Sequence, residues 1–382
     1  MHKNTATSYK QILTLPGTTM YSHIAALALA FTAFTQTIAA PTPGNGSVPL
    51  PNRLLHHWPN GTWVENISVR PNGNLLLTTS TPDGSVWQVK EPWTDNPEVE
   101  KVFNFDEWVD RLIGIGETTP DKYVVVGSRF YSTDAQSSHV ARTFCAMELD
   151  FSKNSTTPSA RLIAWMPESY LLQGVAPLPW DLETVLISDQ YVLRPRQNQT
   201  DWTPSPGQIW TLNTRTGEYK LVMTDYAELN TTYAKGPDVG IDGIKIRDHD
   251  LFWVNQDNSG IYRIKINDTG APADGAKPEL IGSYETMWND MAFDPFNKNL
   301  IWATGLNAVF AATLDGKIVP VDGVGTSDNL TLPGPTACQF GRTEHDKATL
   351  YVTGNLVEVP TNLLDVKLGG WVRALDTTGF TM

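Results

Sequence analysis

The sequence contains only two cysteines, Cys145 and Cys338, among 382 residues, which excludes a fold held together by a disulfide framework. One long-range bridge between them would suit an oxidising compartment, and two buried free thiols are the alternative. No Cys-x-x-Cys pair is present and the seven histidines are scattered, so no zinc-site spacing occurs. The adjacent pair His56-His57 is expected in a β-strand rather than at a metal.

Positive charge is scarce as well. The 28 Lys and Arg against 41 Asp and Glu give a net charge of -13. Nucleic acids and anionic membrane surfaces are therefore excluded as partners, because both require clustered Lys and Arg. No Gly-x-Ser-x-Gly elbow occurs, and Gly270–Lys277 lacks the Gly-Lys step of a phosphate-binding loop.

Long apolar runs are missing except for Ile24–Thr35, which is too short to span a bilayer comfortably. Small residues and a Pro-rich stretch follow it, which predicts a secretory signal peptide over residues 1–40 with cleavage near Ala40. Met20 is an alternative start, and an uncleaved membrane anchor is the alternative interpretation. Residues 41–382 then form a single mature domain, free of the membrane after cleavage.

Asn-x-Ser/Thr sequons are spread over the mature region and indicate a glycosylated protein, secreted or held in the endomembrane lumen. The sequons begin at Asn45, Asn60, Asn66, Asn154, Asn198, Asn230, Asn267 and Asn329.

What the sequence does contain is a repeat. Each copy has a short inner strand, a polar turn with Asp, Asn or Pro, a β-branched or aromatic strand and a further hairpin. The spacing of roughly 40–60 residues is near that of propeller blades. The copies begin near Val64, Leu112, Leu172, Ile241, Asn289 and Thr336.

Helical periodicity of useful length is absent outside the apolar run at the N-terminus. We therefore expect an all-β fold, a six-bladed β-propeller with four-stranded antiparallel blades that stack to bury both faces of each sheet. Arg53–Pro59 would supply the last strand of the sixth blade and close the ring. A pair of β-sandwiches is the alternative.

The innermost strands of a propeller begin at one mouth of its channel, so the turn residues that start each repeat should converge there. Their oxygen atoms are ligands that Ca²⁺ or Mg²⁺ prefers, and Asx-type turns at strand ends are the alternative role. The residues are Glu65, Gln173, Asp242, Asn289, Asp290 and Thr336.

Aromatic residues also gather near the repeat starts, and most are expected to wedge between blades. Trp288 directly precedes Asn289 and is the best candidate for the floor of an apolar pocket at the mouth.

Four segments, WVENISVRPNGNLLLTT, GIDGIKI, NDMAFDPFNKNLIWAT and LYVTG, resemble the fungal branch of the SMP-30/gluconolactonase-like six-bladed propellers. In the lactonase members of that superfamily a Glu, an Asn and an Asp hold an axial divalent metal. The resemblance places Glu65 at the first position, Asp242 at the second and Asn289, beside Asp290, at the third. Two of the three ligand types are thus changed.

The N-terminal segment, the sequons and the ENI-x-VR-x-NG opening also resemble the hetero-Diels–Alderases of tropolone-sesquiterpenoid biosynthesis. The resemblance implies a pericyclase of secondary metabolism that needs no cofactor and binds small apolar metabolites. It would join a tropolone or ortho-quinone methide to a humulene-type alkene. The alternatives are a lactone hydrolase, with a divalent metal at Glu65, Asp242 and Asn289, and a non-catalytic propeller that binds a ligand.

For cycloaddition, the expected catalytic set is Glu65, Asp242, Asn289, Asp290 and Gln173. Glu65 or Asp242 would act as the acid that assists loss of water from an alcohol precursor. Gln173 and Asn289 would donate hydrogen bonds to the carbonyl of the heterodiene. The substrate-binding set is Trp288 and Trp253, which would stack on the diene, and Thr336.

Overall fold

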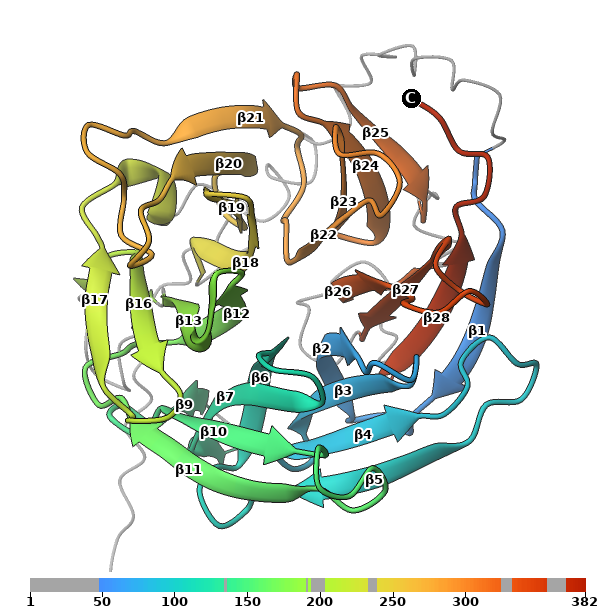
Figure 1. The fold of residues 1–382 in the computed structure, drawn as a ribbon, viewed down its shortest axis with the longest axis horizontal. Helices are drawn as coiled ribbons and strands as arrows, with labels where there is room; N and C mark the ends of the chain where they lie inside the picture. The colour runs from blue at the N-terminus through green and yellow to red at the C-terminus, as the bar shows by residue number, and fades with distance from the viewer. Residues whose placement is uncertain are drawn as a thin grey trace, which may run out of the picture. The chain divides into compact units, whose positions relative to one another are not determined.

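The repeated strand pattern forms six antiparallel sheets of four strands each, arranged around an axis (Figure 1). A computed structural model describes residues 48–133, 136–189, 192–193, 203–232, 239–323, 332–355 and 369–382. The expected six-bladed β-propeller with four-stranded blades is confirmed. The predicted signal peptide over 1–40 lies outside the described residues and stays a prediction.

Each sheet is one blade, and the order of its strands runs from the axis outward. Blade 1 consists of β2 (Trp63–Val69), β3 (Leu75–Thr81), β4 (Ser85–Val89) and β5 (Val99–Asn104). Blade 2 consists of β6 (Arg111–Glu117), β7 (Lys122–Ser128), β10 (Cys145–Asp150) and β11 (Ser159–Trp165). Blade 3 consists of β12 (Leu172–Leu178), β13 (Asp181–Asp189), β16 (Gln208–Asn213) and β17 (Tyr219–Met223).

The second half of the ring repeats this order. Blade 4 consists of β18 (Ile241–Arg247), β19 (Asp250–Asn255), β20 (Gly260–Lys265) and β21 (Glu279–Ser283). Blade 5 consists of β22 (Met291–Phe293), β23 (Leu300–Gly305), β24 (Ala308–Thr313) and β25 (Ile318–Asp322). Blade 6 consists of β26 (Pro335–Phe340), β27 (Thr349–Gly354), β28 (Trp371–Asp376) and β1 (Asn52–His57).

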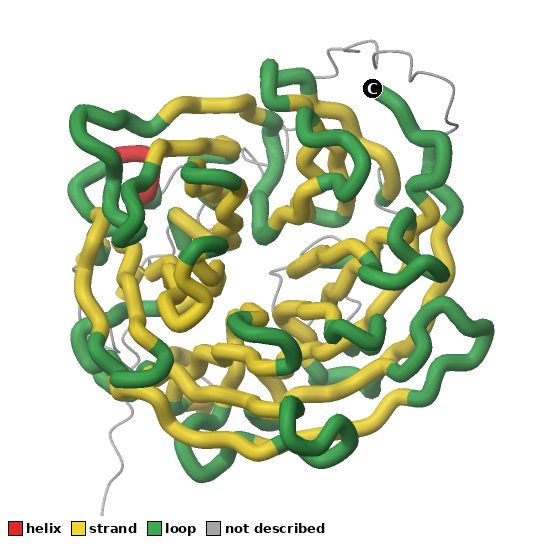
Figure 2. Tube along the Cα trace, viewed as in Figure 1, coloured by secondary structure: helices red, strands yellow, loops and turns green. Residues whose placement is uncertain are grey.

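Little else is regular in the described residues, as Figure 2 shows. One 3₁₀ helix, η1 (Ala227–Leu229), follows β17. Two small hairpins join the second strand of a blade to its third strand. They are β8 (Phe130–Thr133) with β9 (Gln136–His139), and β14 (Val192–Leu193) with β15 (Thr203–Pro204). No helix among the described residues is long and apolar enough to cross a membrane.

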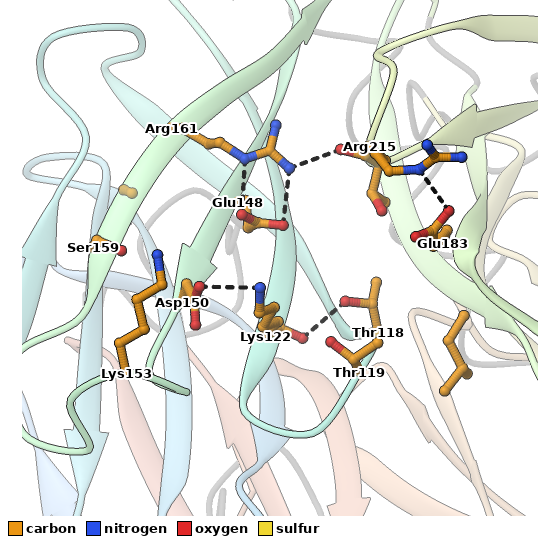
Figure 3. Close-up of a pocket in the computed structure, with 13 residues that line it drawn as sticks. Thr118, Thr119, Lys122, Glu148, Asp150, Lys153, Ser159, Arg161, Glu183 and Arg215 are labelled. Atoms are coloured by element: carbon orange, nitrogen blue, oxygen red, sulfur yellow. Dashed lines mark hydrogen bonds and ion pairs between the residues drawn. The ribbon is translucent and has the colours of Figure 1, made fainter.

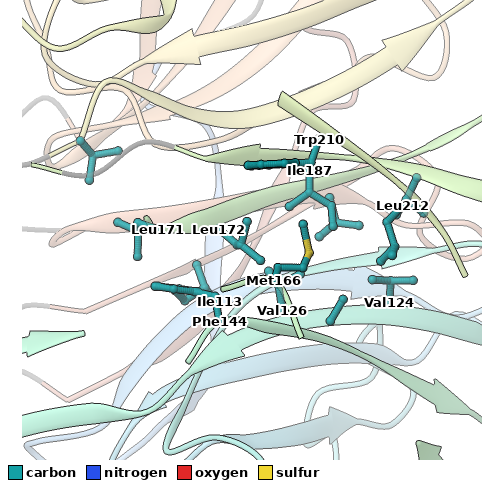
Figure 4. Close-up of a cluster of buried hydrophobic side chains, with 14 residues drawn as sticks. Ile113, Val124, Val126, Phe144, Met166, Leu171, Leu172, Ile187, Trp210 and Leu212 are labelled. Carbon is teal, nitrogen blue, oxygen red and sulfur yellow. The ribbon is translucent and has the colours of Figure 1, made fainter. Parts of the chain in front are cut away.

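The core consists of six apolar clusters, each lying between two neighbouring blades. Figure 4 shows the cluster between blades 2 and 3. On β7, Tyr123 and Val125 pack toward blade 1, whereas Val124 and Val126 pack toward blade 3. Because both faces of such a strand are buried, its sequence is a continuous apolar run without polar alternation.

The ring closes as the sequence predicts. β1 pairs antiparallel with β28, from Asn52 opposite Leu375 to His57 opposite Trp371, so the first described strand completes the last blade. His56 and His57 lie in this closing strand, as expected. A closed ring leaves no innermost strand without a neighbouring blade, which removes the need for any crosslink to hold the ends together.

Of the two alternatives for the cysteines, the structure has the buried free thiols, because Cys145 and Cys338 are both free and buried. Cys145 packs in the cluster between blades 1 and 2, whereas Cys338 packs in the cluster between blades 5 and 6. Burial raises the pKa of both thiols, which keeps them protonated and unreactive.

The described sequons differ in exposure. Asn60, Asn154 and Asn267 are exposed. Asn66 is half-buried within the innermost strand β2, and the half-buried Asn230 accepts a hydrogen bond from Gly207 N at 2.6 Å. A glycan suits the first three positions better than the last two. The remaining three sequons lie outside the described residues, at Asn45, Asn198 and Asn329.

Candidate functional site: the start of the innermost strands

Five of the six innermost strands shift register near their first residues, where a β-bulge or an irregularity interrupts the ladder. Bulges re-aim side chains and are common at the rims of barrels and beside active sites. In blade 5, Asn289 and Asp290 occupy the equivalent place just before β22. The residues within the shifts are Glu65, Ile113, Gly114, Gln173, Gly174, Asp242, Gly243 and Thr336.

Neighbouring blades approach one another closely at these shifts, and glycine makes the approach feasible. A Cβ on Gly114 would lie 1.9 Å from the backbone oxygen of Gln173, and one on Gly243 would lie 2.7 Å from Cα of Asp290. Gly243 N also donates to the backbone oxygen of Asn289 at 2.9 Å. The glycine of one blade thus packs directly against the mouth residue of the next blade.

Side-chain hydroxyls join the blades at the same level. Ser188 Oγ on β13 donates to the backbone oxygen of Asp242 at 2.6 Å, which links blade 3 to blade 4. Thr336 Oγ1 donates to the backbone oxygen of Val64 at 3.0 Å, which links blade 6 to blade 1. The hydroxyl of Thr336 therefore serves ring closure, in addition to its predicted place at the mouth.

We call six of the mouth residues the axial ring, namely Glu65, Ile113, Gln173, Asp242, Asp290 and Thr336, and all six are buried. Their exposed fractions are 7% for Glu65, 4% for Ile113, 7% for Gln173, 4% for Asp242, 2% for Asp290 and 4% for Thr336.

Three carboxyl groups of the axial ring act on one another through space. The charges of Glu65 and of Asp290 both raise the pKa of Asp242. Glu65 belongs to blade 1 and Asp242 to blade 4, which are opposite one another in a ring of six. An interaction between these two blades must cross the axis.

Burial raises the pKa of Asp242. Desolvation is the main cause that raises the pKa of Asp242 well above its usual value, and the carboxylates of Glu65 and Asp290 add to it. The pKa of Asp290 is also raised by burial, although the nearby Lys245 opposes that shift. A protonated carboxyl group in a dry site can donate a hydrogen bond or a proton.

Polar side chains hold each of these carboxyl groups. Lys245 Nζ lies 2.7 Å from Oδ1 of Asp290 in an ion pair. Gln256 Nε2 lies 3.5 Å from Oδ2 of Asp242, and Trp63 Nε1 donates to a carboxylate oxygen of Glu65. The acids are thus positioned by residues of two blades, blade 4 and blade 1.

Two predicted site residues do not line the axis. Trp288 and Trp253 each have 0% of their surface exposed. Trp288 Nε1 donates to the backbone oxygen of Ser259 at 2.8 Å, and Trp253 stacks on Tyr262 with the ring centroids 5.5 Å apart. Both rings fill the clusters between blades, so neither has a face free for the diene, and the stacking role predicted for them does not fit this placement.

Asn289 takes part mainly through its backbone, which pairs with Thr304 and Gly243, while its side chain is half-buried. The sequence-based prediction missed four residues: Ile113, which belongs to the ring, and Trp63, Lys245 and Gln256, which lie beside it. Lys245 carried a usable signal, because it is a charged residue between the apolar Ile244 and Ile246 of an innermost strand. The extra residue at the bulge brings Lys245 and Asp242, three positions apart, onto one face of β18.

The cluster does not fit the divalent metal that the superfamily implies. The ammonium of Lys245 is paired with Asp290, so one of the oxygen donors that a metal would need already has a cation as its partner. Within the described ranges, no group of three or more His, Cys, Asp and Glu side chains is arranged to hold a metal ion.

The cavity shown in Figure 3 lies at the opposite end of blades 2 and 3, beside the turns that follow their innermost strands. Its volume is about 510 Å³. Most of its charged side chains are already paired with one another, as in Arg161 with Glu148 at 2.8 Å and Arg215 with Glu183 at 2.9 Å.

Two curated proteins share the whole fold region with this chain. One relative, from Phoma sp, is named a hetero-Diels-Alderase. It is 84% identical over 352 residues, which cover 92% of this chain and 100% of the relative. The chain belongs to the hetero-Diels-Alderase family. The relative from Sarocladium schorii, named hetero-Diels-Alderase asR5, is 58% identical over 341 residues. The match covers 87% of this chain and 85% of the relative. No family model matches the chain.

Solved structures agree on the fold. A luciferin-regenerating enzyme superposes with a TM-score of 0.59 at 12% identity, covering 87% of this chain and 97% of its own. Regucalcin from Agrobacterium tumefaciens, a calcium-binding protein, superposes with a TM-score of 0.54 at 15% identity. The match covers 87% of this chain and 94% of regucalcin. A gluconolactonase from Xanthomonas campestris superposes with a TM-score of 0.51 at 11% identity. The match covers 88% of this chain and 99% of the gluconolactonase. At these identities the likeness shows the propeller fold of the superfamily and nothing about chemistry.

Proposed function

We propose that the protein catalyses an intermolecular hetero-Diels–Alder cycloaddition at the axial ring. The heterodiene is an ortho-quinone methide derived from a tropolone, and the alkene is a humulene-type sesquiterpene. The observation that carries the reaction class is the 84% identity to a relative named for it. A buried carboxyl group with a raised pKa, on the blade opposite a second carboxyl group, supports the choice of site.

The first step forms the heterodiene. Asp242 gives its proton to the hydroxyl oxygen of the alcohol precursor, the C–O bond breaks and water leaves. The ring hydroxyl of the precursor loses its proton to the Glu65 carboxylate, which gives the neutral quinone methide. One proton is thus delivered and one is removed, and the net change is the loss of water.

The second step is the cycloaddition. One C–C and one C–O bond form together between the heterodiene and the alkene, and no atom leaves. A hydrogen bond to the heterodiene oxygen, which Gln173 supplies, polarises the diene. Holding two apolar partners in one orientation supplies several kcal/mol, up to roughly 7–11 in favourable cases.

Two further parts of the proposal concern cellular context. The exposed sequons at Asn60, Asn154 and Asn267 support passage through the secretory pathway. We also propose that the reaction requires no cofactor, since proton transfer and orientation by side chains account for both steps. Neither curated relative is named a lactone hydrolase, so we do not propose that activity.

The test is an assay of the purified glycosylated protein with the alcohol precursor and a humulene-type alkene, read by chiral LC–MS. The wild type should form one enantiomer faster than the uncatalysed background, with or without EDTA. D242N and E65Q should each lower the rate by at least about 100-fold, because general acid–base catalysis contributes that much. Racemic product at the background rate with wild-type protein would overturn these substrates.

The matched control is D274N, which removes an exposed carboxyl group far from the ring in sequence. It should keep the wild-type rate. If D242N and E65Q are folded by circular dichroism and also keep the wild-type rate, the axial ring is not the active site.

A further inference from the structure

We infer that Trp63 is the aromatic surface on which the mouth receives the heterodiene, with Glu65 held beside it by the indole N–H. This role rests on the proposed function, whose heterodiene is a flat conjugated ring. Trp63 takes the place that Trp253 and Trp288, buried between blades, do not fill.

Trp63 lies at the mouth because of its position in the strand. It is the first residue of β2, the innermost strand of blade 1, and it pairs with Thr81. Its Nε1 donates a hydrogen bond to a carboxylate oxygen of Glu65, two residues further along. The indole therefore lies next to a carboxyl group of the axial ring.

The residue between these two points elsewhere. Val64 is 0% exposed and packs in the cluster between blades 6 and 1. Successive side chains of a strand alternate between its faces, so an indole that contacts Glu65 lies away from that cluster. Trp63 belongs to none of the six apolar clusters that the described residues form, and its ring stacks on no other aromatic ring among them.

The exposure of Trp63 differs from that of the tryptophans predicted for this role. Trp63 is half-buried, whereas Trp253 and Trp288 have no exposed surface. Because its N–H is already satisfied by Glu65, the rest of the indole surface is apolar. A flat apolar surface beside a carboxylate suits a planar conjugated ligand that carries an acidic hydroxyl group, which is the chemistry of a tropolone.

The backbone on both sides of Trp63 is fixed. Thr62 and Val64 are both buried. The backbone oxygen of Val64 accepts a hydrogen bond from Thr336 Oγ1 of blade 6 at 3.0 Å. A Cβ on Gly370 would lie 3.3 Å from the backbone oxygen of Thr62. Since blade 6 packs directly against this strand, the indole stands on a platform that loses little entropy when a ligand binds.

The experiment measures binding of tropolone, a stable planar probe without the leaving hydroxyl group, by isothermal titration calorimetry. Purified full-length wild type, W63F and W63L are compared in buffer with EDTA, because tropolone chelates metals. W63F keeps a flat ring, so its Kd should stay within about threefold of the wild-type value. W63L keeps apolar bulk without an aromatic face, so its Kd should rise about 10-fold, at the upper end of what aromatic pairing contributes.

The same variants separate the two roles of the indole in the cycloaddition assay. W63F loses the N–H that holds Glu65, so kcat should fall about 10-fold while KM stays unchanged, as for a lost hydrogen bond to a charged group. W63L should lower kcat and also raise KM about 10-fold. A merely structural role would instead lower the Tm of W63L and leave its Kd for tropolone unchanged.

W93L is the matched control. Trp93 is also half-buried, but it lies in the connection between β4 and β5, at the opposite end of blade 1, and stacks on His345. W93L should keep the wild-type Kd, KM and kcat. Should W63L not fold, fluorine NMR of wild type labelled with fluorotryptophan replaces it: the resonance that is missing from W63F should move when tropolone is added.

Several results would overturn the role of Trp63. They are no tropolone binding by wild type, wild-type binding by W63L, equal losses of binding in W63F and W63L, or an unmoved Trp63 resonance. If tropolone binds wild type and W63F tightly and W63L weakly, while the proposed substrates give no product, the aromatic surface stands and the proposed cycloaddition is wrong.

Discussion

Individual buried acids in this propeller serve different purposes according to what surrounds them. Asp242 is opposed by other carboxyl groups, whereas Asp189 at the end of β13 is surrounded by donors. Its Oδ1 accepts from Tyr170 N at 2.9 Å and Leu171 N at 2.6 Å, and its Oδ2 accepts from Trp210 Nε1 at 2.9 Å. These bonds tie the connection between blades 2 and 3 to the core. Asp189 is a structural acid, and its three donors leave no place for a substrate.

Asp189 should make stability depend on pH. Burial raises its pKa from 3.8 to about 6, despite the three hydrogen bonds that favour the charged form. The folded state then binds more protons than the unfolded state, so stability is full below about pH 4 and falls as the pH rises to about 6. The contribution is about 3 kcal/mol for a shift of about two units. Urea unfolding of wild type and D189N should show their stability difference falling over this range and constant above it.

The variant D189N isolates this group because asparagine does not titrate. The variant also loses stability for a second reason, because the amide N–H of the asparagine would face the N–H of Trp210 Nε1 where Asp189 has an acceptor oxygen. This loss of stability does not change with pH. A stability difference between the two proteins that is the same from about pH 4 to 7 would contradict the assignment.

At the scale of elements, the register shifts of the innermost strands place the candidate-site residues at the mouth. Each shift inserts a residue near the mouth, and the neighbouring glycine lets the next blade approach. Outer strands have a different character: they carry cross-strand ion pairs such as Arg263 with Glu279 at 2.8 Å. Charged outer edges discourage pairing with other chains. The candidate site thus lies at the inner strands, and such cross-strand ion pairs lie at the outer ones.

Gly114 tests the close approach of blades 2 and 3. G114A places a Cβ 1.9 Å from the backbone oxygen of Gln173, so one blade must move away from the other. We expect a loss of about 3 kcal/mol or more in the free energy of unfolding, at the upper end of overpacking effects. Denaturant unfolding followed by tryptophan fluorescence measures it.

G275A is the comparison for this substitution. Gly275 has a φ of +72°, and a Cβ there would have no other atom within 4 Å, so alanine adds backbone strain without crowding. It should cost about 1 kcal/mol. Equal losses for the two variants would show that the approach at Gly114 is not rigid.

At the scale of the whole molecule, stability depends on closing the ring. The six core clusters are all contacts between blades, so each blade is stable only with both neighbours present. The sixth blade is completed by β1, which joins segments from the two ends of the described chain. Leu55 and Trp58 bring this closing segment into the cluster between blades 6 and 1.

Removing the closing strand should therefore open the propeller. A chain that begins after Pro59 lacks the partner of β28 and exposes its edge, so we expect aggregation or a Tm lower by more than about 10 °C, on the order of several kcal/mol. Size-exclusion chromatography and thermal unfolding measure both effects. A chain that begins at Val48 keeps β1 and should match the full-length protein. A stable monomer without β1 would show that blade 6 does not need it.

Local features of the sequence were enough to predict the all-β fold, the six blades, the closing strand and the mouth positions of Glu65, Gln173, Asp242 and Asp290. They could do so because strand alternation, turn residues and the repeat spacing are encoded within each segment of roughly 50 residues. No contact between distant segments had to be known.

Packing between distant segments decided the rest. The free cysteines, the buried Trp253 and Trp288, and the ion pair of Lys245 with Asp290 depend on which blades become neighbours and how closely they approach. The raised pKa of Asp242 depends on its burial and on Glu65, which lies on the opposite blade and far away in the chain. Burial and electrostatic coupling are properties of the closed ring, and only the tertiary structure brings these groups within reach of one another.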